Sequence, residues 1–318
     1  MVGYTLGGGL SWLARKHGLA ANSVTAIELV TPDGQLVRAT AHEHADLFWA
    51  LRGGGGNFGV VTAMEFRLYP YDEVYAGMLL WPYERASEVL STWHEWTRTA
   101  PEEITTSFRI LHFPPMPELP DFLRGRSVTV IDGASAGAGA AGVEAIAALR
   151  ALEPEVDAWM PSTPAMLSRI HMDPEEPMPY IGHSSILGEL GEAALQTFAA
   201  HVEPGSPLMF AELRHLGGAL ARVPDGSGAI SGFDGEYLYF AVGAVMAPEL
   251  AEAITVAGHA ALAALAPYET GSAYLNFVEH PTDTSRFYTD AAYERLSGVR
   301  AAVDPDGVMV GNHPVPVA

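Results

Sequence analysis

The chain has 318 residues, which is more than one hydrophobic core usually organises, so we expect about two domains. Hydrophobic residues make up 48% of the sequence and charged residues 17%, a balance that predicts a folded globular protein. The 38 acidic and 17 basic residues give a formal net charge of −21, which repels nucleic acid and anionic membranes. The absence of cysteine excludes disulfides, thiolate nucleophiles and cysteine-ligated metals.

Targeting signals are not evident. The sequence has no run of 18 or more apolar residues, and its first residues lack the basic and apolar regions of a secretory signal. We therefore expect a cytoplasmic protein with a small-molecule substrate and with neither a nucleic-acid nor a membrane partner.

The first 70 residues alternate short helical and strand-like patterns. The expected elements are a helix over 10–17, a strand over 25–30 that pairs with 35–39 through a turn, a helix over 47–52 and a strand over 60–68. These elements predict a compact α+β unit that ends near Pro70.

Longer elements follow Pro70. An amphipathic helix is expected around 86–93, strands at 107–111, 127–131, 208–213 and 237–245, and helices near 138–152, 192–201 and 249–265. This order predicts an antiparallel sheet covered by helices. A strand over 273–278 and a helix over 290–303 complete the chain.

Two glycine runs carry the functional signal: Gly7 to Gly9 and Gly53 to Gly56. Glycine permits positive φ and close approach of a ligand to the backbone, although both runs could instead be structural turns. Neither run matches the dinucleotide or phosphate-loop fingerprints. The runs favour a large anionic or planar cofactor.

The residues around both runs resemble a known family. The stretches are Gly-x-Thr-Leu-Gly-Gly-Gly-x-x-Trp-Leu at 3–13, Asp-Leu-Phe-Trp-Ala-Leu-Arg-Gly-Gly-Gly-Gly-Asn-Phe-Gly-Val-Val-Thr at 46–62 and Tyr-Leu-Asn-Phe at 274–277. They resemble the berberine-bridge-enzyme-like FAD-linked oxidases, which are flavoproteins of the vanillyl-alcohol-oxidase type with a PCMH-type FAD-binding domain.

The resemblance implies an α+β fold in three parts. Residues 1–70 would be the second subdomain of the FAD-binding domain, 71–269 a substrate domain with an antiparallel sheet, and 270–318 a C-terminal berberine-bridge-type segment. The family's first FAD subdomain and its flavin-linked histidine have no counterpart before Gly3. We therefore expect a truncated or mis-started chain, whose Met1 is internal to a longer enzyme.

The resemblance also implies which residues bind FAD. The cofactor-binding residues would be Gly3, Thr5, Leu6, Gly7, Gly8, Gly18, Leu19, Gly59, Val60 and Asn276. Small or backbone-only chemistry at most of these positions agrees with a ligand that lies flat on the chain. Asn276 would face the flavin pyrimidine edge; an ordinary amide bonded to a neighbouring loop is the alternative.

The activity implied is hydride transfer from a small alcohol, amine or sugar-like substrate to flavin, with O2 as a possible acceptor. Tyr274 is the candidate catalytic residue, because strand alternation would place it on the same side as Asn276. A core tyrosine with a satisfied hydroxyl is the alternative. The second hypothesis for the whole chain is a non-catalytic remnant or small-molecule binding module.

Histidines outside the glycine runs give weaker signals. His171, Asp173 and His183 suggest a metal site, but their spacing does not support one, so no metal is expected. Arg214 and His215, at the end of an apolar strand, are candidates for the substrate pocket or for ordinary solvent-facing positions.

Overall fold

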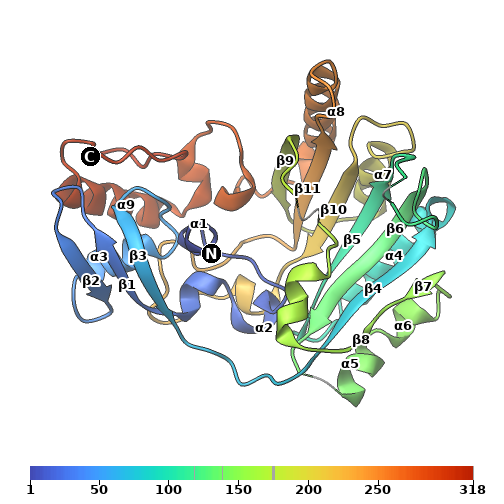
Figure 1. Cartoon of the computed structure of the whole chain (residues 1–318), viewed down its shortest axis with the longest axis horizontal. Helices are drawn as coiled ribbons and strands as arrows, with labels where there is room; N and C mark the ends of the chain where they lie inside the picture. The colour runs from blue at the N-terminus through green and yellow to red at the C-terminus, as the bar shows by residue number, and fades with distance from the viewer. Residues whose placement is uncertain (118, 138, 174–175, 318) are drawn as a thin grey trace. The chain divides into compact units, whose positions relative to one another are not determined.

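The computed structural model describes residues 1–117, 119–137, 139–173 and 176–317 (Figure 1). The chain forms two compact units. Unit 1 comprises Met1–Pro70, Gly218–Phe233 and Gly271–Ala318, and unit 2 comprises Tyr71–Gly217 and Asp234–Thr270.

This division differs from the expected domains in residues 218–233, which the sequence assigns to the substrate domain. The backbone N–H of Ala229 donates to the Trp49 carbonyl at 3.2 Å, and that of Ile230 to the Arg52 carbonyl at 3.4 Å. The segment therefore packs beside the second glycine run. This contact joins residues far apart in the sequence, so local sequence patterns could not predict it.

Unit 1 is built on a three-stranded antiparallel sheet in the order β2-β1-β3. Its strands are β1 (Val24–Val30), β2 (Leu36–Thr40) and β3 (Val60–Phe66). Its helices are α1 (Val2–Leu6), α2 (Ala14–His17), η1 (Ala20–Ser23), α3 (Ala45–Leu51), η4 (Gly218–Ala221), η6 (Leu275–Phe277), η7 (Thr284–Phe287) and α9 (Asp290–Val303). Side chains of β1, α3 and α9, including Ile27, Leu51 and Leu296, share one buried core.

Helix α9 has the bounds that the sequence predicted. The hydroxyl of Thr289 accepts the backbone N–H of Ala292 at 3.3 Å and so caps its first turn. Helix α3 begins two residues earlier than expected, and Asp46 lies in its first turn, where it pairs with Arg295 at 2.7 Å.

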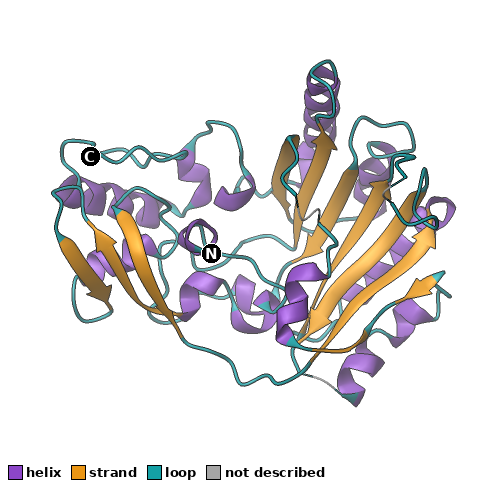
Figure 2. Cartoon of the chain, viewed as in Figure 1, coloured by secondary structure: helices purple, strands orange, loops and turns teal. Residues whose placement is uncertain are grey.

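Unit 2 contains an eight-stranded sheet in the order β7-β4-β6-β5-β10-β11-β9, with β8 also paired to β4. Figure 2 shows the strands of this sheet in orange and the helices in purple. All of its pairings are antiparallel. The strands are β4 (Val74–Pro82), β5 (Ile104–His112), β6 (Ser127–Ser135), β7 (Val156–Asp157), β8 (Met160–Ser162), β9 (Tyr180–Leu187), β10 (Phe210–His215) and β11 (Tyr237–Ala244). The helices are η2 (Tyr83–Arg85), α4 (Ala86–Thr97), α5 (Ala140–Ala145), α6 (Ala147–Arg150), η3 (Pro164–Arg169), α7 (Glu192–Ala200), α8 (Leu250–Leu265) and η5 (Ala266–Tyr268).

One face of this sheet packs against helices. Trp93 of α4, Phe198 of α7 and Ile254 of α8 share a core with Phe108 of β5 and Tyr239 of β11. Alternate strand residues point to the opposite face, which we call the second face. The antiparallel sheet covered by helices was predicted, and the α+β class is confirmed. Strands β4 and β9 and the short strands β7 and β8 were not predicted.

Helix α8 together with η5 forms a long apolar helical stretch. The stretch Leu250–Tyr268 has 19 residues with a mean hydropathy of 1.4, and 22% of its apolar window is buried. By length and composition alone it could span a membrane, but the core helix of a soluble protein passes the same test, so one such helix is weak evidence for a membrane span.

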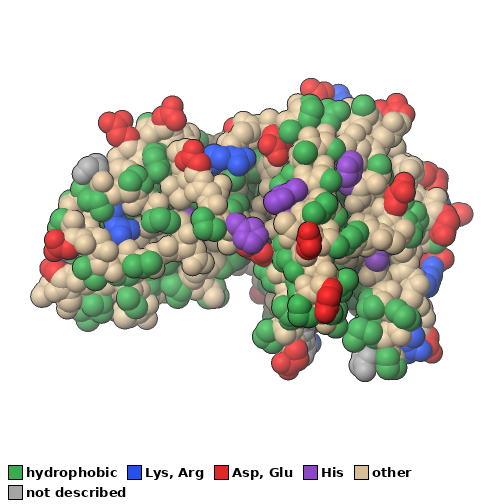
Figure 3. All heavy atoms as spheres, turned by 90° about the horizontal axis from the view of Figure 1, so that it is seen from above, with side chains coloured by type: hydrophobic (Ala, Val, Ile, Leu, Met, Phe, Trp, Pro, Cys, Tyr) green, Lys and Arg blue, Asp and Glu red, His purple; other side chains and the backbone are tan. Residues whose placement is uncertain are grey.

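Figure 3 shows acidic side chains spread over the displayed face, with fewer basic ones among them.

Candidate functional site

In unit 1, the side chain of Tyr274 is hydrogen-bonded to the main chain of the first glycine run. Its hydroxyl accepts the backbone N–H groups of Gly9 at 3.1 Å and Leu10 at 3.0 Å. The side chain is only 1% exposed, and its ring meets Phe233 edge-on at 5.2 Å between centroids. These contacts are those of the structural alternative, a core tyrosine with a satisfied hydroxyl. The catalytic role of Tyr274 stays a prediction.

The strand expected at 273–278 is wrong, because residues 275–277 form the 3-10 helix η6. Strand alternation therefore does not place Tyr274 and Asn276 on one side. They meet instead through a hydrogen bond, in which Asn276 Nδ2 donates to the Tyr274 hydroxyl at 2.9 Å. The same amide donates to the Tyr4 carbonyl at 2.9 Å. Asn276 thus ties η6 to α1 and has only its carbonyl oxygen left for a ligand.

The two glycine runs lie beside each other within unit 1. The backbone N–H of Gly55 donates to the carbonyl of Leu6 at 3.0 Å. Most of these glycines have chain atoms where a side chain would be: a Cβ on Gly7 would lie 1.9 Å from Asn276 Oδ1, and one on Gly53 would lie 2.4 Å from the Ile230 nitrogen. Close packing of the chain on itself therefore explains these glycines. A Cβ on Gly56, in contrast, would meet no atom within 4 Å.

Four buried polar atoms of unit 1 have no hydrogen-bond partner among the described residues: Thr5 Oγ1, Asn22 Oδ1, Arg300 Nε and His313 Nδ1. The first two belong to residues at or near the predicted cofactor positions. Unpaired buried polar atoms are costly, so a ligand or an ordered water is expected to complete them. A flavin nucleotide is rich in donors and acceptors, and the residues present fit FAD in this respect.

The other predicted cofactor residues are distributed unevenly. A Cβ on Gly8 would touch Leu19 at 3.3 Å and Tyr274 at 3.5 Å, so these three positions are neighbours. Gly3 is exposed at the start of α1, whereas Gly18 is buried and ends α2 with a φ of 76°. Gly59 and Val60 stand at the start of β3. There a Cβ on Gly59 would lie 2.5 Å from the Val30 carbonyl oxygen, and Val60 is 61% exposed. The assignment of all these residues to FAD stays a prediction.

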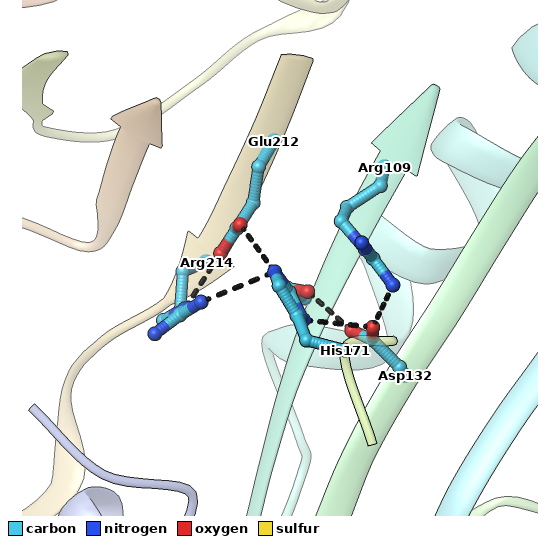
Figure 4. Close-up of polar contacts among 6 residues, drawn as sticks. Arg109, Asp132, His171, Glu212 and Arg214 are labelled. Atoms are coloured by element: carbon cyan, nitrogen blue, oxygen red, sulfur yellow. Dashed lines mark hydrogen bonds and ion pairs between the residues drawn. The ribbon is translucent and has the colours of Figure 1, made fainter. Parts of the chain in front are cut away.

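Unit 2 contains a buried ionic cluster that the sequence did not reveal (Figure 4). On the second face of the sheet, an Arg109–Asp132 ion pair joins β5 to β6, and Arg214 Nε donates to Glu212 Oε1 at 2.6 Å on β10. His171 lies between the two carboxylates. We call Arg109, Asp132, His171, Glu212 and Arg214 the ionic cluster.

Strand register brings these charges together. Arg109 pairs with Glu212 across β5 and β10, and Ser107, which donates to Asp132, pairs with that residue across β5 and β6. The signal available in the sequence was a charged residue inside each of three apolar strands. Because the partners are far apart along the chain, that signal shows burial of charge but not which charges meet.

Burial alone would raise the pKa of both carboxyl groups, but their partners reverse this. The charges of Arg214 and His171 lower the pKa of Glu212 to about 2. Those of Arg109 and His171 hold the pKa of Asp132 well below its ordinary value. Both groups are therefore ionised at neutral pH.

The remaining histidine candidates lie elsewhere in unit 2. His183 packs on the helix-covered face against His259 of α8, with 5.1 Å between the rings, so it does not meet His171. Among the described residues no three ligating side chains are grouped to hold a metal ion; Pro174 and Glu175 of the suspected metal segment lie outside them. His215 is buried and lines a cavity of about 360 Å³ with His94, Arg98, Glu236 and Tyr237.

Comparisons of the sequence with known proteins find FAD-linked oxidoreductases. The chain is 37% identical over 112 residues to an uncharacterized FAD-linked oxidoreductase of Bacillus subtilis, an alignment that covers 34% of this chain and 25% of the relative. It is 38% identical over 106 residues to the chitooligosaccharide oxidase of Gibberella zeae, covering 32% of this chain and 22% of the relative. No family model matches the chain.

Solved structures share the fold over nearly the whole chain. The berberine-bridge-enzyme-like protein 1 of Physcomitrella patens, as a D396N variant, gives a TM-score of 0.83 at 20% identity, covering 99% of this chain and 70% of that one. The 6-hydroxy-D-nicotine oxidase of Arthrobacter nicotinovorans gives 0.83 at 21% identity, covering 100% and 71%.

The fold is thus that of the berberine-bridge-enzyme-like flavoprotein oxidases, and the resemblance noted in the sequence is confirmed. Several of the relatives found by sequence are named as FAD-linked or FAD-dependent, which agrees with the predicted cofactor. The alignments span only about a quarter of the length of the curated relatives.

Proposed function

We propose that the chain works as an FAD-dependent oxidoreductase that transfers a hydride from a small alcohol, amine or sugar-like substrate to flavin. The observation that carries this proposal is the sequence similarity to FAD-linked oxidoreductases, supported by the shared fold. The name of the chitooligosaccharide oxidase supports a sugar-like substrate and, because it is an oxidase, O2 as electron acceptor.

Bound FAD would supply the hydride acceptor. This chain's own residues would bind the cofactor and orient it. Thr5 would donate or accept through its buried, unpaired hydroxyl, and Asn276 would accept through Oδ1, since both hydrogens of its amide are already used. Tyr274 would hold the main chain of Gly9 and Leu10 in place, so that the backbone of the glycine run keeps a fixed shape.

Titration of the 318-residue chain with FAD tests the proposal. Saturable changes in the flavin absorbance bands, followed by anaerobic bleaching when alcohols, amines or oligosaccharides are added, are expected. Absence of saturable binding rejects an FAD site in this chain. Saturable binding that no substrate class bleaches favours the small-molecule binding module.

A matched pair of variants links the binding to the structure. Thr5→Val removes only the unpaired hydroxyl and should weaken FAD binding about 5- to 10-fold, the effect of roughly one hydrogen bond. Thr25→Val alters an exposed threonine of β1 and should leave the affinity unchanged. Equal affinities for the two variants would show that Thr5 does not touch the cofactor.

A further inference from the structure

Residues 163–173 of unit 2 follow β8 and contain η3, and none of them is fully buried. Three apolar residues of this segment, Pro164, Leu167 and Ile170, are partly buried. Two backbone hydrogen bonds lie within the segment itself, from the Met166 nitrogen to the Thr163 carbonyl and from the Met172 nitrogen to the Arg169 carbonyl. Apolar burial therefore holds this segment less firmly than it holds the strands of the sheet, whose core residues are fully buried.

One side chain of the segment does reach into the protein. His171 is only 12% exposed, and its ring bridges two strands of the sheet: Nδ1 lies 2.9 Å from Asp132 Oδ2 on β6, and Nε2 lies 3.0 Å from Glu212 Oε2 on β10 (Figure 4). Strand β5 lies between these two strands in the sheet. His171 thus connects residues 163–173 to two strands on the second face.

The charge state of the ring decides whether both contacts attract. A neutral imidazole has one N–H and one lone pair, so it can donate to only one of two ionised carboxylates, whereas an imidazolium donates to both. Among the described residues, the charged groups that face the ring include Asp132 on β6, Arg109 on β5, and Glu212 and Arg214 on β10. Arg214 Nη2 lies 3.5 Å from His171 Nε2.

These neighbours favour the charged ring on balance. Burial and the Arg109 charge would lower the pKa of His171, but the carboxylates of Asp132 and Glu212 outweigh them and raise it above its ordinary value. Because Asp132 and Glu212 have depressed pKa values, they remain ionised throughout the range in which the ring titrates.

We propose that His171 is a protonation-dependent latch that fastens residues 163–173 to the second face of the sheet. With the ring charged, the row Arg109, Asp132, His171, Glu212, Arg214 alternates in sign. Loss of the ring proton turns a lone pair toward one carboxylate, and the segment has only partly buried apolar residues to keep it in place. It then detaches and exposes both carboxylates to water. This inference does not depend on FAD binding.

Hydrogen exchange measured by mass spectrometry between pH 5.5 and 9.5, with rates corrected for their intrinsic pH dependence, tests the latch. The amides of Met166 and Met172 report on the segment. Their protection should fall roughly tenfold or more as pH rises through the pKa of His171, while the amides of β5 and β6 stay protected. His171→Gln should lack this protection at every pH, and His42→Gln, an exposed histidine of unit 1, should behave as wild type.

An NMR titration of the His171 ring keeps the test decisive if His171→Gln fails to fold. Protection lost in step with ring deprotonation supports the latch. A ring that loses its proton while the exchange of Met166 and Met172 stays constant overturns it, and so does wild-type protection in a folded His171→Gln protein.

Discussion

The hydroxyl of Tyr274 accepts the backbone N–H of Leu10 at 3.0 Å, a bond between residues 264 positions apart. It joins the C-terminal part of unit 1 to the first glycine run. Because Gly9 donates to the same oxygen, one phenol satisfies two buried backbone donors.

Tyr274→Phe should therefore destabilise unit 1. The substitution keeps the ring but leaves the N–H groups of Gly9 and Leu10 without an acceptor, at a cost of about 1–3 kcal/mol. Urea unfolding followed by fluorescence measures the change. Tyr83→Phe, at a partly exposed tyrosine with no hydrogen bond to its hydroxyl among the described residues, should change stability little. Unchanged stability of Tyr274→Phe together with lost flavin reduction would instead support the catalytic prediction.

The glycines of the second run should differ sharply in their tolerance of alanine. A Cβ on Gly54 would lie 2.4 Å from the Ala50 carbonyl oxygen and 2.7 Å from the Phe58 ring, whereas one on Gly56 would meet nothing within 4 Å. Gly54→Ala should cost about 1–3 kcal/mol through overpacking, and Gly56→Ala should be neutral or stabilise by up to about 1 kcal/mol. Thermal unfolding of the two variants checks this contrast. Equal tolerance would mean that packing does not require glycine at this loop.

Asn57, which follows the second run, fixes the C-terminal tail. Its side chain donates to the carbonyls of Gly54 at 2.7 Å and His313 at 3.1 Å, and accepts from Arg300 Nη1 at 2.8 Å and the Val315 nitrogen at 3.1 Å. Asn57→Ala should destabilise unit 1 by about 2–4 kcal/mol, because it leaves several buried groups without a hydrogen-bond partner.

The control for Asn57→Ala is Asn312→Ala, at an exposed asparagine of the same tail. Limited proteolysis of the tail, together with urea unfolding, separates the two variants. If Asn57→Ala leaves the tail as resistant to protease as wild type, the four bonds do not hold it.

Local sequence patterns were sufficient to predict a helix or strand where its own residues mark its ends and its buried face. Helix α9 was predicted to its ends because Thr289 caps it and its apolar positions follow helical spacing. Strand β4 was missed because Val74–Pro82 is buried on both faces and so does not alternate. Strand β9, Tyr180–Leu187, contains glycine, histidine and serines, which favour strands weakly.

The candidate sites could be predicted only in part. The glycine runs were found from the sequence. The reason for most of these glycines depends on the tertiary structure, because a Cβ there would meet distant residues such as Asn276 and Ile230. The ionic cluster was missed for the same reason. His171 reaches Asp132 and Glu212 only after strands β5, β6 and β10 are in register.

Acid should weaken unit 2 through the ionic cluster. Glu212 has its pKa depressed to about 2 in the folded protein. A depressed pKa contributes stability that is complete above the unfolded value, near 4.5, and is lost as pH falls toward 2. The urea midpoint of wild type should therefore fall steeply across this window, and Glu212→Gln should show a flatter profile.

At neutral pH, Glu212→Gln should itself be destabilised by about 3–5 kcal/mol, because His171 and Arg214 lose their shared carboxylate inside the protein. Glu203→Gln, at an exposed glutamate of the same unit, should keep both the wild-type stability and its pH profile. The comparison separates the buried charge from the general effect of net charge, since both variants remove one acid. Parallel pH profiles for wild type and Glu212→Gln would show that the acid sensitivity arises outside the ionic cluster.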